Sequence, residues 1–276
     1  MSERDNWELL LPSMIEPMYK HRPFHLKDFL QERDVHMAVN NKRWNLLGPL
    51  SACSELEFYG ASTSSIRDSE SKRACGLQKL PTCVVLSIGS NGQWEFEKAI
   101  ISSTNCTVHT FDCTISNIHP PPSIRSRTIL HNLCLGSSPP RDRNYFLEVP
   151  RKNGRPGAWK NRQWKYSQLK ESSFKNYSEL VRRAGLSSAP SLLKMDIEGY
   201  EWQTIPSIVS STLAPKQIAV EMHFQTQMPG LSWFGRYKSP VEILAFGNMM
   251  HKRGYRIASR QDNPACKWCT EILWIK

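Results

Sequence analysis

Short apolar runs alternate with helically spaced apolar positions from about residue 81 to the end of the chain. Each run has the length of a β-strand, and a run that is apolar throughout is typical of a strand buried on both faces of a parallel sheet. The expected strands span 84–88, 108–111, 128–133, 191–195, 217–222, 255–258 and 271–275.

Helices are expected between these strands, because apolar side chains recur there at three- and four-residue spacing. Gly185 follows one such segment at the place of a helix C-terminal glycine. Ser239-Pro240-Val241-Glu242 is a capping box with proline at the first helical position, and it predicts a helix that ends before Gly254. The helical segments lie near 96–100, 177–184, 202–209 and 240–252. Strands that alternate with helices predict an α/β layer structure.

The first part of the chain has a different pattern. Residues 23–39 show helical spacing, and residues 60–73 are rich in serine and charge, which is typical of a loop. We therefore expect residues 1–80 to form an N-terminal extension and residues 81–276 to form the main domain.

A glycine-containing turn follows the first strand of that domain. Gly89 and Gly92 come directly after the apolar run and before the first helical segment. Glycine allows a sharp turn and the close approach of a ligand, so the order strand, glycine loop, helix is typical of a nucleotide-binding unit. Taken alone, the pair of glycines fits a simple tight turn equally well.

Two carboxylate positions follow later strands. Asp112 ends the second strand, roughly 20 residues beyond the glycine loop, where an acid can accept hydrogen bonds from ribose hydroxyls. The alternative is a surface acid that caps the next turn. Asp196, Glu198 and Glu201 follow the fourth strand, at the edge where open α/β sheets bind ligands. This segment predicts an active-site edge.

Four segments together resemble a known family. They are Ile-Gly-Ser-Asn-Gly at 88–92, Phe-Asp-Cys-Thr at 111–114, Leu-Leu-Lys-Met-Asp-Ile-Glu-Gly-Tyr-Glu-Trp at 192–202 and Val-Glu-Met-His-Phe at 220–224. These segments are similar to motifs of eukaryotic methyltransferase-like proteins related to the FkbM group, and the resemblance runs from about Cys53 to the carboxyl end. It implies a Rossmann-like class I methyltransferase sheet, mostly parallel with an antiparallel closing strand, that binds S-adenosyl-L-methionine.

The resemblance also implies a set of site residues. The cofactor-binding residues would be Ile88, Gly89, Ser90, Gly92 and Asp112, and the catalytic residues would be Asp196, Glu198, Glu221 and His223. The methyl acceptor, through oxygen or nitrogen, is unidentified.

Each of the catalytic positions has a structural alternative. The carboxylates could form a network with Lys194 or with backbone amides, and His223 could be a structural histidine. We assign no metal site, although two neighbouring carboxylates can also bind magnesium or calcium.

Two features depart from the class I pattern. Ser87 stands where many of these enzymes have an acid, and the glycine loop lacks a middle glycine. A noncatalytic protein of the same fold therefore stays open as the alternative. The missing third glycine and the lack of a second mononucleotide half count against a nicotinamide-dependent oxidoreductase.

The charge of the chain is strongly positive, at +11. Residues 150–175 combine many lysines and arginines with Trp159, Trp164, Tyr166 and Phe174. Such a segment can bind nucleic acid or an anionic glycan, or it can be a solvated insertion between two strands. The noncatalytic alternative would use it to bind an anionic partner.

The eight cysteines permit disulfides without showing them. Cys266-x-x-Cys269 is the one close pair, and it is open to a disulfide, to two thiols or to a zinc site. No run of 18 apolar residues predicts a transmembrane helix. The first residues lack the pattern of a signal peptide, so we expect a cytoplasmic protein if this start is native, and a secretory one if a leader has been removed.

Overall fold

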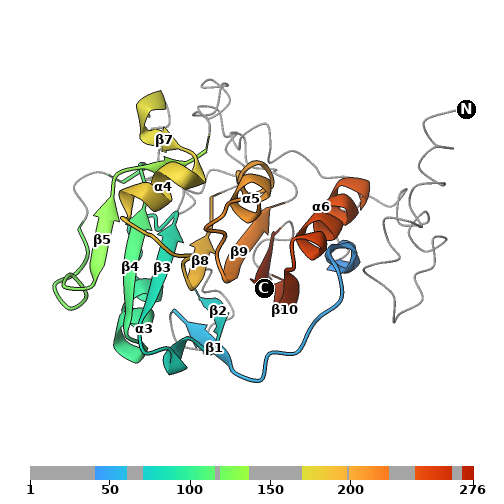
Figure 1. Cartoon of the computed structure of the whole chain (residues 1–276), viewed down its shortest axis with the longest axis horizontal. Helices are drawn as coiled ribbons and strands as arrows, with labels where there is room; N and C mark the ends of the chain where they lie inside the picture. The colour runs from blue at the N-terminus through green and yellow to red at the C-terminus, as the bar shows by residue number, and fades with distance from the viewer. Residues whose placement is uncertain are drawn as a thin grey trace, which may run out of the picture.

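The centre of the protein is a seven-stranded sheet in the order β10-β11-β9-β8-β3-β4-β5 (Figure 1). In the computed structural model the described residues are 41–60, 71–115, 119–136, 170–197, 199–223, 240–262 and 269–276. The strands are β3 (Cys83–Ile88), β4 (Cys106–Phe111), β5 (Thr128–His131), β8 (Leu192–Met195), β9 (Gln217–His223), β10 (Arg256–Asp262) and β11 (Cys269–Ile275). All seven strands predicted from the apolar runs are confirmed.

The sheet is parallel except for one strand. Neighbouring strands from β5 to β9 run parallel, while β11 pairs antiparallel with both β9 and β10. The predicted antiparallel closing strand is thus β11, and it lies inside the sheet rather than at its edge. β3 is the first strand of the sheet in chain order and lies inside it, between β4 and β8. Here the strand order reverses, and ligands of open α/β sheets bind outside the carboxyl ends of the strands at this point. The fold is that of a class I methyltransferase Rossmann sheet.

Two apolar layers cover the sheet. On one face lie α4 (Tyr177–Arg183), α5 (Glu201–Val209), α6 (Pro240–Lys252) and the short helix η2 (Asn41–Leu47). On the other lie α3 (Glu95–Ser103) and the hairpin β1 (Leu56–Tyr59)–β2 (Lys72–Cys75). Smaller elements are η3 (Leu77–Lys79), η7 (Glu171–Ser173), β6 (Cys134–Leu135) and β7 (Phe174–Lys175). Because side chains alternate along a strand, Leu193 and Met195 pack on the first face and Leu192 on the second.

The predicted helix ends are confirmed where the structure describes them. Asn176 caps α4 in a capping box with Glu179, and Gly185 has the left-handed backbone (φ 68°) that ends the helix. α6 ends before Gly254, which is also left-handed (φ 89°). Ser239 and the predicted helix at 23–39 lie outside the described residues.

The hairpin β1–β2 was not expected from the sequence. The prediction of a loop at 60–73 is wrong for Lys72 and Arg73, which belong to β2, and residues 61–70 lie outside the described part. The strand pattern was missed because β2 is only four residues long and carries two cations.

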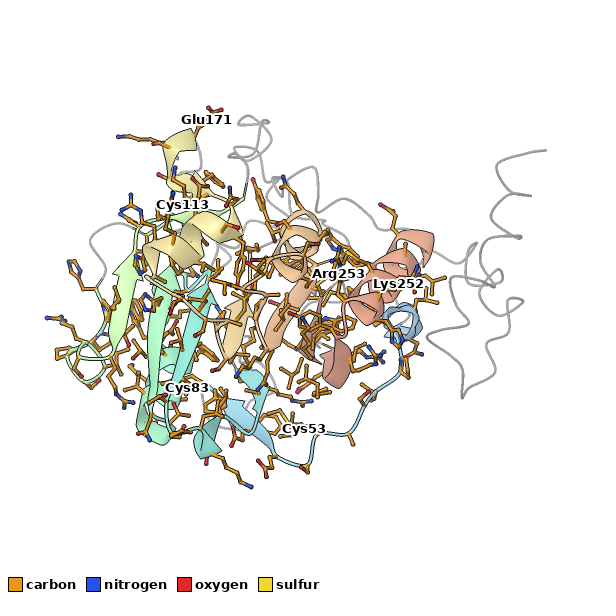
Figure 2. All side chains as sticks on the ribbon, in the orientation of Figure 1. Cys53, Cys83, Cys113, Glu171, Lys252 and Arg253 are labelled. Carbon is orange, nitrogen blue, oxygen red and sulfur yellow. A yellow bond between two sulfur atoms is a disulfide. The ribbon has the colours of Figure 1, made fainter. Side chains whose placement is uncertain are left out.

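Disulfides tie several elements together. They join Cys53 to Cys75, Cys83 to Cys106 and Cys113 to Cys134 (Figure 2), and Cys269 is disulfide-bonded as well. The alternatives of two thiols or a zinc site are thus excluded for Cys269, while Cys266 lies outside the described residues. Among the described helices, none is long and apolar enough to cross a membrane.

Candidate functional site

The glycine loop after β3 is bent by residues with positive φ. Gly89, Asn91 and Gly92 have φ of 77°, 51° and 72°. A Cβ at Gly89 would lie 1.9 Å from the carbonyl oxygen of Asp196, so only glycine fits there. The same contact places the loop directly beside the residue that follows β8, and the predicted Gly89 and Asp196 are therefore adjacent.

Asp112, at the tip of β4, holds this loop. Its Oδ2 accepts a 2.7 Å hydrogen bond from the Asn91 amide and a 3.4 Å contact from the Ser90 hydroxyl. Its Oδ1 accepts from the amide and the hydroxyl of Thr114, at 2.8 and 2.6 Å. The side chain is nearly fully buried. Asp112 therefore fixes the conformation of the glycine loop, and the contact with Ser90 is the longest of its four hydrogen bonds.

A buried carboxyl group, that of Glu97, lies beside Ser87, although β3 itself carries no acid. The Ser87 hydroxyl donates to Glu97 Oε1 of α3 at 2.6 Å, and Thr110 is a second donor at 3.4 Å. Burial raises the pKa of Glu97, an effect that the charge of Lys194 and the Ser87 hydrogen bond oppose. The Lys194 ammonium donates to the Gly89 carbonyl at 2.6 Å. A carboxyl group of the following helix thus lies next to the position at which β3 lacks an acid.

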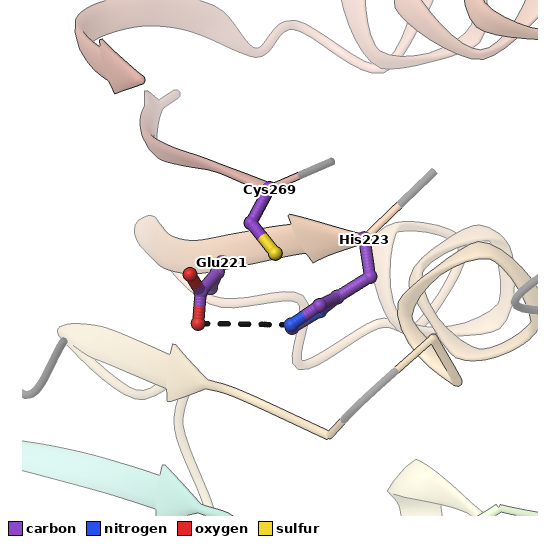
Figure 3. Close-up of side chains that lie close together, drawn as sticks. All are labelled: Glu221, His223 and Cys269. Carbon is purple, nitrogen blue, oxygen red and sulfur yellow. Dashed lines mark ion pairs between the residues drawn. The ribbon is translucent and has the colours of Figure 1, made fainter. Parts of the chain in front are cut away.

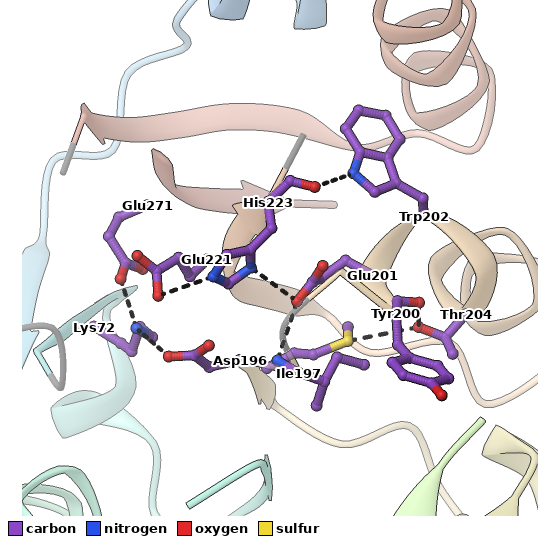
Figure 4. A network of polar contacts seen from close by, with 11 residues as sticks. Lys72, Asp196, Ile197, Tyr200, Glu201, Trp202, Thr204, Glu221, His223 and Glu271 are labelled. Carbon is purple, nitrogen blue, oxygen red and sulfur yellow. Dashed lines mark hydrogen bonds and ion pairs between the residues drawn. The ribbon is translucent and has the colours of Figure 1, made fainter. Parts of the chain in front are cut away.

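A second polar cluster lies at the carboxyl ends of β8 and β9 (Figure 4). We call it the acid cluster, and it consists of Lys72, Asp196, Glu201, Glu221, His223 and Glu271. The Lys72 ammonium is 2.6 Å from Glu271 Oε1 and 3.7 Å from Asp196 Oδ2. Most of these side chains are almost fully buried, and Asp196 retains 14% exposure. Asp196 is therefore one of the few members that a ligand can reach.

His223 is held from both sides. Its Nδ1 lies 3.2 Å from Glu201 Oε1, and its Nε2 lies 3.7 Å from Glu221 Oε2. Glu201 is fully buried and also accepts from the Ile197 amide at 3.0 Å. The Trp202 indole donates to the His223 carbonyl at 2.6 Å. We assign the Nδ1 proton to the bond with Glu201, which leaves the Nε2 lone pair directed at Glu221.

Neighbouring charges shift the pKa values of two carboxyl groups in the acid cluster in opposite directions. Burial would raise the pKa of Asp196, but the positive charges of Lys72 and Lys194 outweigh burial and lower this pKa. Burial and the neighbouring Asp196 and Glu271 carboxylates raise the pKa of Glu221 well above its usual value. Asp196 therefore loses its proton at lower pH than Glu221 does, as expected for acids that share a site.

The structure brings together most of the residues predicted for the site. Asp196, Glu221 and His223 lie in one cluster. The Ile88 side chain is in the core, and only its backbone is near, since its carbonyl accepts from the Asp196 amide at 3.1 Å. Glu198 lies outside the described residues.

Three members of the acid cluster were missed by sequence analysis. Lys72 and Glu271 are far from Asp196 in sequence, and no motif connects them. Glu271 faces Glu221 across the β9–β11 pair, which only the strand register reveals. Glu201 begins α5, where the helix dipole favours an acid, and it was therefore not included among the predicted catalytic residues.

Glu221, His223 and Cys269 form a compact group whose ligand atoms lie within 4.8 Å of one another (Figure 3). A zinc site would need the Cys269 sulfur as a thiolate. Cys269 is disulfide-bonded, so this sulfur is not a thiolate in the structure. The trio does not make a metal site in this oxidation state.

The basic segment is described only from Lys170 onward. Phe174 is buried and packs against Tyr200, with the ring centroids 6.2 Å apart. Its ring is therefore part of the core, so Phe174 neither stacks on a base nor belongs to a solvated insertion. Residues 150–169 lie outside the described part.

Comparisons with known proteins identify a methyltransferase domain. A family profile described as "Methyltransferase domain" matches residues 69–276. No curated protein matches the chain. Among solved structures, a pre-rRNA processing fibrillarin from Methanococcus jannaschii is similar at 10% identity, with 80% of this chain and 87% of that one covered and a TM-score of 0.38.

Two other solved structures show the same level of similarity. A fibrillarin from Aeropyrum pernix with natively bound S-adenosyl-L-methionine is 9% identical, with coverages of 84% and 86% and a TM-score of 0.34. The mitomycin 7-O-methyltransferase MmcR is 11% identical, with coverages of 70% and 49% and a TM-score of 0.32. The family profile covers most of the chain, and the protein therefore belongs to this methyltransferase domain family.

Proposed function

We propose that the protein transfers a methyl group from S-adenosyl-L-methionine to an oxygen or nitrogen of an acceptor. The observation that carries this proposal is the contact between Gly89 and Asp196, because it joins the glycine loop to the acid cluster at the point where the strand order reverses. Membership of the FkbM-related group stays a prediction from the sequence motifs.

The loop fits the cofactor in its chemistry. A carboxylate offers about four acceptor sites, and the 3.4 Å contact from Ser90 to Asp112 is weak enough for a ribose hydroxyl to replace it. Ile88, Gly89, Ser90, Gly92 and Asp112 would hold the cofactor. When bound, S-adenosyl-L-methionine supplies an electrophilic methyl group on a positively charged sulfur.

The acid cluster would take up the proton of the acceptor. A bound donor would supply its methyl group to the acceptor atom, and the proton that this atom loses would need a base at this edge of the sheet. Asp196 is charged and partly exposed, so it accepts the proton that the acceptor loses. Glu221 then donates its own proton to His223 Nε2 and receives one from Asp196. Glu201 stabilises the imidazolium through Nδ1.

Two effects at this site would lower the barrier to methyl transfer. A positioned general base contributes roughly 10²–10⁴-fold in rate, and orientation of the two reactants contributes up to about 7–11 kcal/mol of the barrier. Both effects need Asp196 to be held relative to the glycine loop, which the Gly89 contact provides.

The disulfides bear on where the acceptor is found. Disulfides persist in oxidising compartments and are rare in the cytosol. Seven of the eight cysteines are disulfide-bonded among the described residues. These bonds favour a secretory or extracellular acceptor over a cytosolic one.

The first test measures binding and turnover separately. Titration calorimetry with S-adenosyl-L-methionine is expected to give saturable heat, and labelled cofactor is expected to transfer its methyl group to a component of cell extract or secreted material. Asp196→Asn is expected to lower methyl transfer by at least about 10²-fold and to leave cofactor binding in place. Glu95→Gln, an exposed carboxylate on α3, is the matched control and should match the wild type.

The competing function is that of a noncatalytic protein which binds an anionic partner through residues 150–175. The absence of heat at millimolar cofactor would refute the proposed transferase and favour this alternative. Full turnover by Asp196→Asn, with cofactor bound, would refute only the role of Asp196.

A further inference from the structure

Lys72 enters the acid cluster from outside the seven-stranded sheet. It is the first residue of β2, in the hairpin that packs on the face of the sheet opposite α4 and α5. Its side chain is 1% exposed, and its ammonium lies between Glu271 on β11 and Asp196 after β8 (Figure 4). A lysine this deeply buried must be paired, because an isolated buried charge costs far more than a fold can supply.

The surroundings of Lys72 are strongly acidic. Glu221 lies opposite Glu271 in the β9–β11 register, and like charges in that position repel each other. Burial would lower the pKa of Lys72, but the charges of Glu271, Asp196 and Glu221 outweigh burial and raise it, so the ammonium stays charged. The other titratable groups near Lys72 and its two partners are Lys194 on β8, His223 on β9 and Arg73 on β2.

The hairpin that carries Lys72 is fixed at several points. The Cys53–Cys75 disulfide closes it, and the Cys75 backbone exchanges two 2.7 Å hydrogen bonds with the Gln217 side chain at the start of β9. Arg73 donates to Ser259 and Gln261 on β10. These contacts fix the backbone that carries Lys72. A residue that orients a reactive carboxylate needs to be fixed in this way.

We propose that Lys72 is a positioning residue of the active site, whose ammonium holds the Asp196 carboxylate in place and in its charged form. This inference rests on the proposed function. Lys72 touches neither donor nor acceptor and acts through Asp196.

The test compares Lys72→Met with Lys72→Arg by their pH profiles. Methyl transfer from labelled S-adenosyl-L-methionine is measured between pH 5 and 9. Without the ammonium, Asp196 holds its proton to higher pH, so the acidic limb of the profile in Lys72→Met should move up by about one pH unit or more. Lys72→Arg should lie close to the wild type, and Lys79→Met, at an exposed ion pair, should equal it.

A measurement of stability tests the same charge without turnover. In Lys72→Met the folded state should bind more protons, so its melting temperature should fall more steeply than that of the wild type as the pH rises from 5 to 8. An unchanged melting profile or an unchanged acidic limb would overturn the inference. No cofactor binding by the wild type would instead overturn the proposed function, and it would be seen before any variant is made.

Glu271→Gln provides a second variant in case Lys72→Met does not fold. It removes the carboxylate that competes with Asp196 for the ammonium and leaves no positive charge unpaired. The acidic limb should then move down in pH, opposite to the effect of Lys72→Met. A shift upward, or none, would contradict the inference.

Discussion

The two carboxylates at the tips of β4 and β8 lie in contrasting surroundings. Asp112 accepts only from backbone amides and hydroxyls, and every one of those donors belongs to the loops that it holds. Asp196 lies beside Glu221 and Lys72, so its pKa depends on the charges of neighbouring side chains. The first environment fixes the backbone of the glycine loop, and the second places several titratable groups next to one another. Under the proposed function, the first would hold the methyl donor and the second would take up the proton of the acceptor.

Gly89 is where these two regions meet, so its substitution should have the largest effect. Gly89→Ala has to adopt positive φ, which costs about 1–2 kcal/mol, and its Cβ would overlap the Asp196 carbonyl, which adds roughly 1–3 kcal/mol. Denaturant unfolding should show the sum. Gly185→Ala has a similar φ with no atom within 4 Å of its Cβ and should cost only the first amount. Equal losses in the two variants would mean that the contact with Asp196 is unimportant.

Removal of single disulfides should distinguish the surroundings of Asp112 from those of Asp196. Each encloses a loop of similar length, with separations of 21 to 23 residues, so removal of any one by a double Cys→Ser change should cost roughly 3 kcal/mol. Loss of Cys113–Cys134, beside Asp112, should weaken cofactor binding. Loss of Cys53–Cys75, beside Lys72, should slow methyl transfer instead.

Calorimetry and initial rates distinguish these outcomes, and peptide mapping without reductant checks the bonds themselves. Cys83–Cys106 joins the amino ends of β3 and β4, at the opposite edge of the sheet from the site, and serves as the control. Its loss should lower stability alone. Equal losses of cofactor binding and turnover in all three variants would contradict separate roles for the surroundings of Asp112 and Asp196.

The smallest effect concerns the edge of the sheet next to Asp112. His131 Nε2 lies 3.0 Å from His109 Nδ1, and its ring stacks on Phe111. Burial, together with the charges of His109 and Arg183, lowers the pKa of His131 to about 4. The unfolded chain therefore binds the extra proton between about pH 6.5 and 4, and stability is lost as the pH falls through this window.

His131→Phe should reduce that loss. Because the ring is only half-buried, the expected difference is about 1 kcal/mol between pH 7 and 4.5, measured by denaturant unfolding at each pH. An identical pH slope in the variant would show that His131 does not titrate as described.

Much of the fold could be predicted because its signals are local. The strand runs, the glycine loop and the end of α4 at Gly185 each depend on a few neighbouring residues, and the structure confirms them. The prediction failed for the hairpin β1–β2, since four residues with two cations carry no clear strand pattern. The disulfide partners were equally undetermined, because eight cysteines permit many pairings.

By itself, the amino-acid sequence determined that strands and helices alternate and that Asp112, Asp196 and His223 lie at the carboxyl ends of strands. Only the tertiary structure decided what surrounds them. Lys72 and Glu271 reach Asp196 from elements far away in the chain, and Glu97 reaches Ser87 from the next helix. The physical reason is that side-chain periodicity is a local property, whereas the charge state of a buried carboxylate depends on every group that folding brings near it.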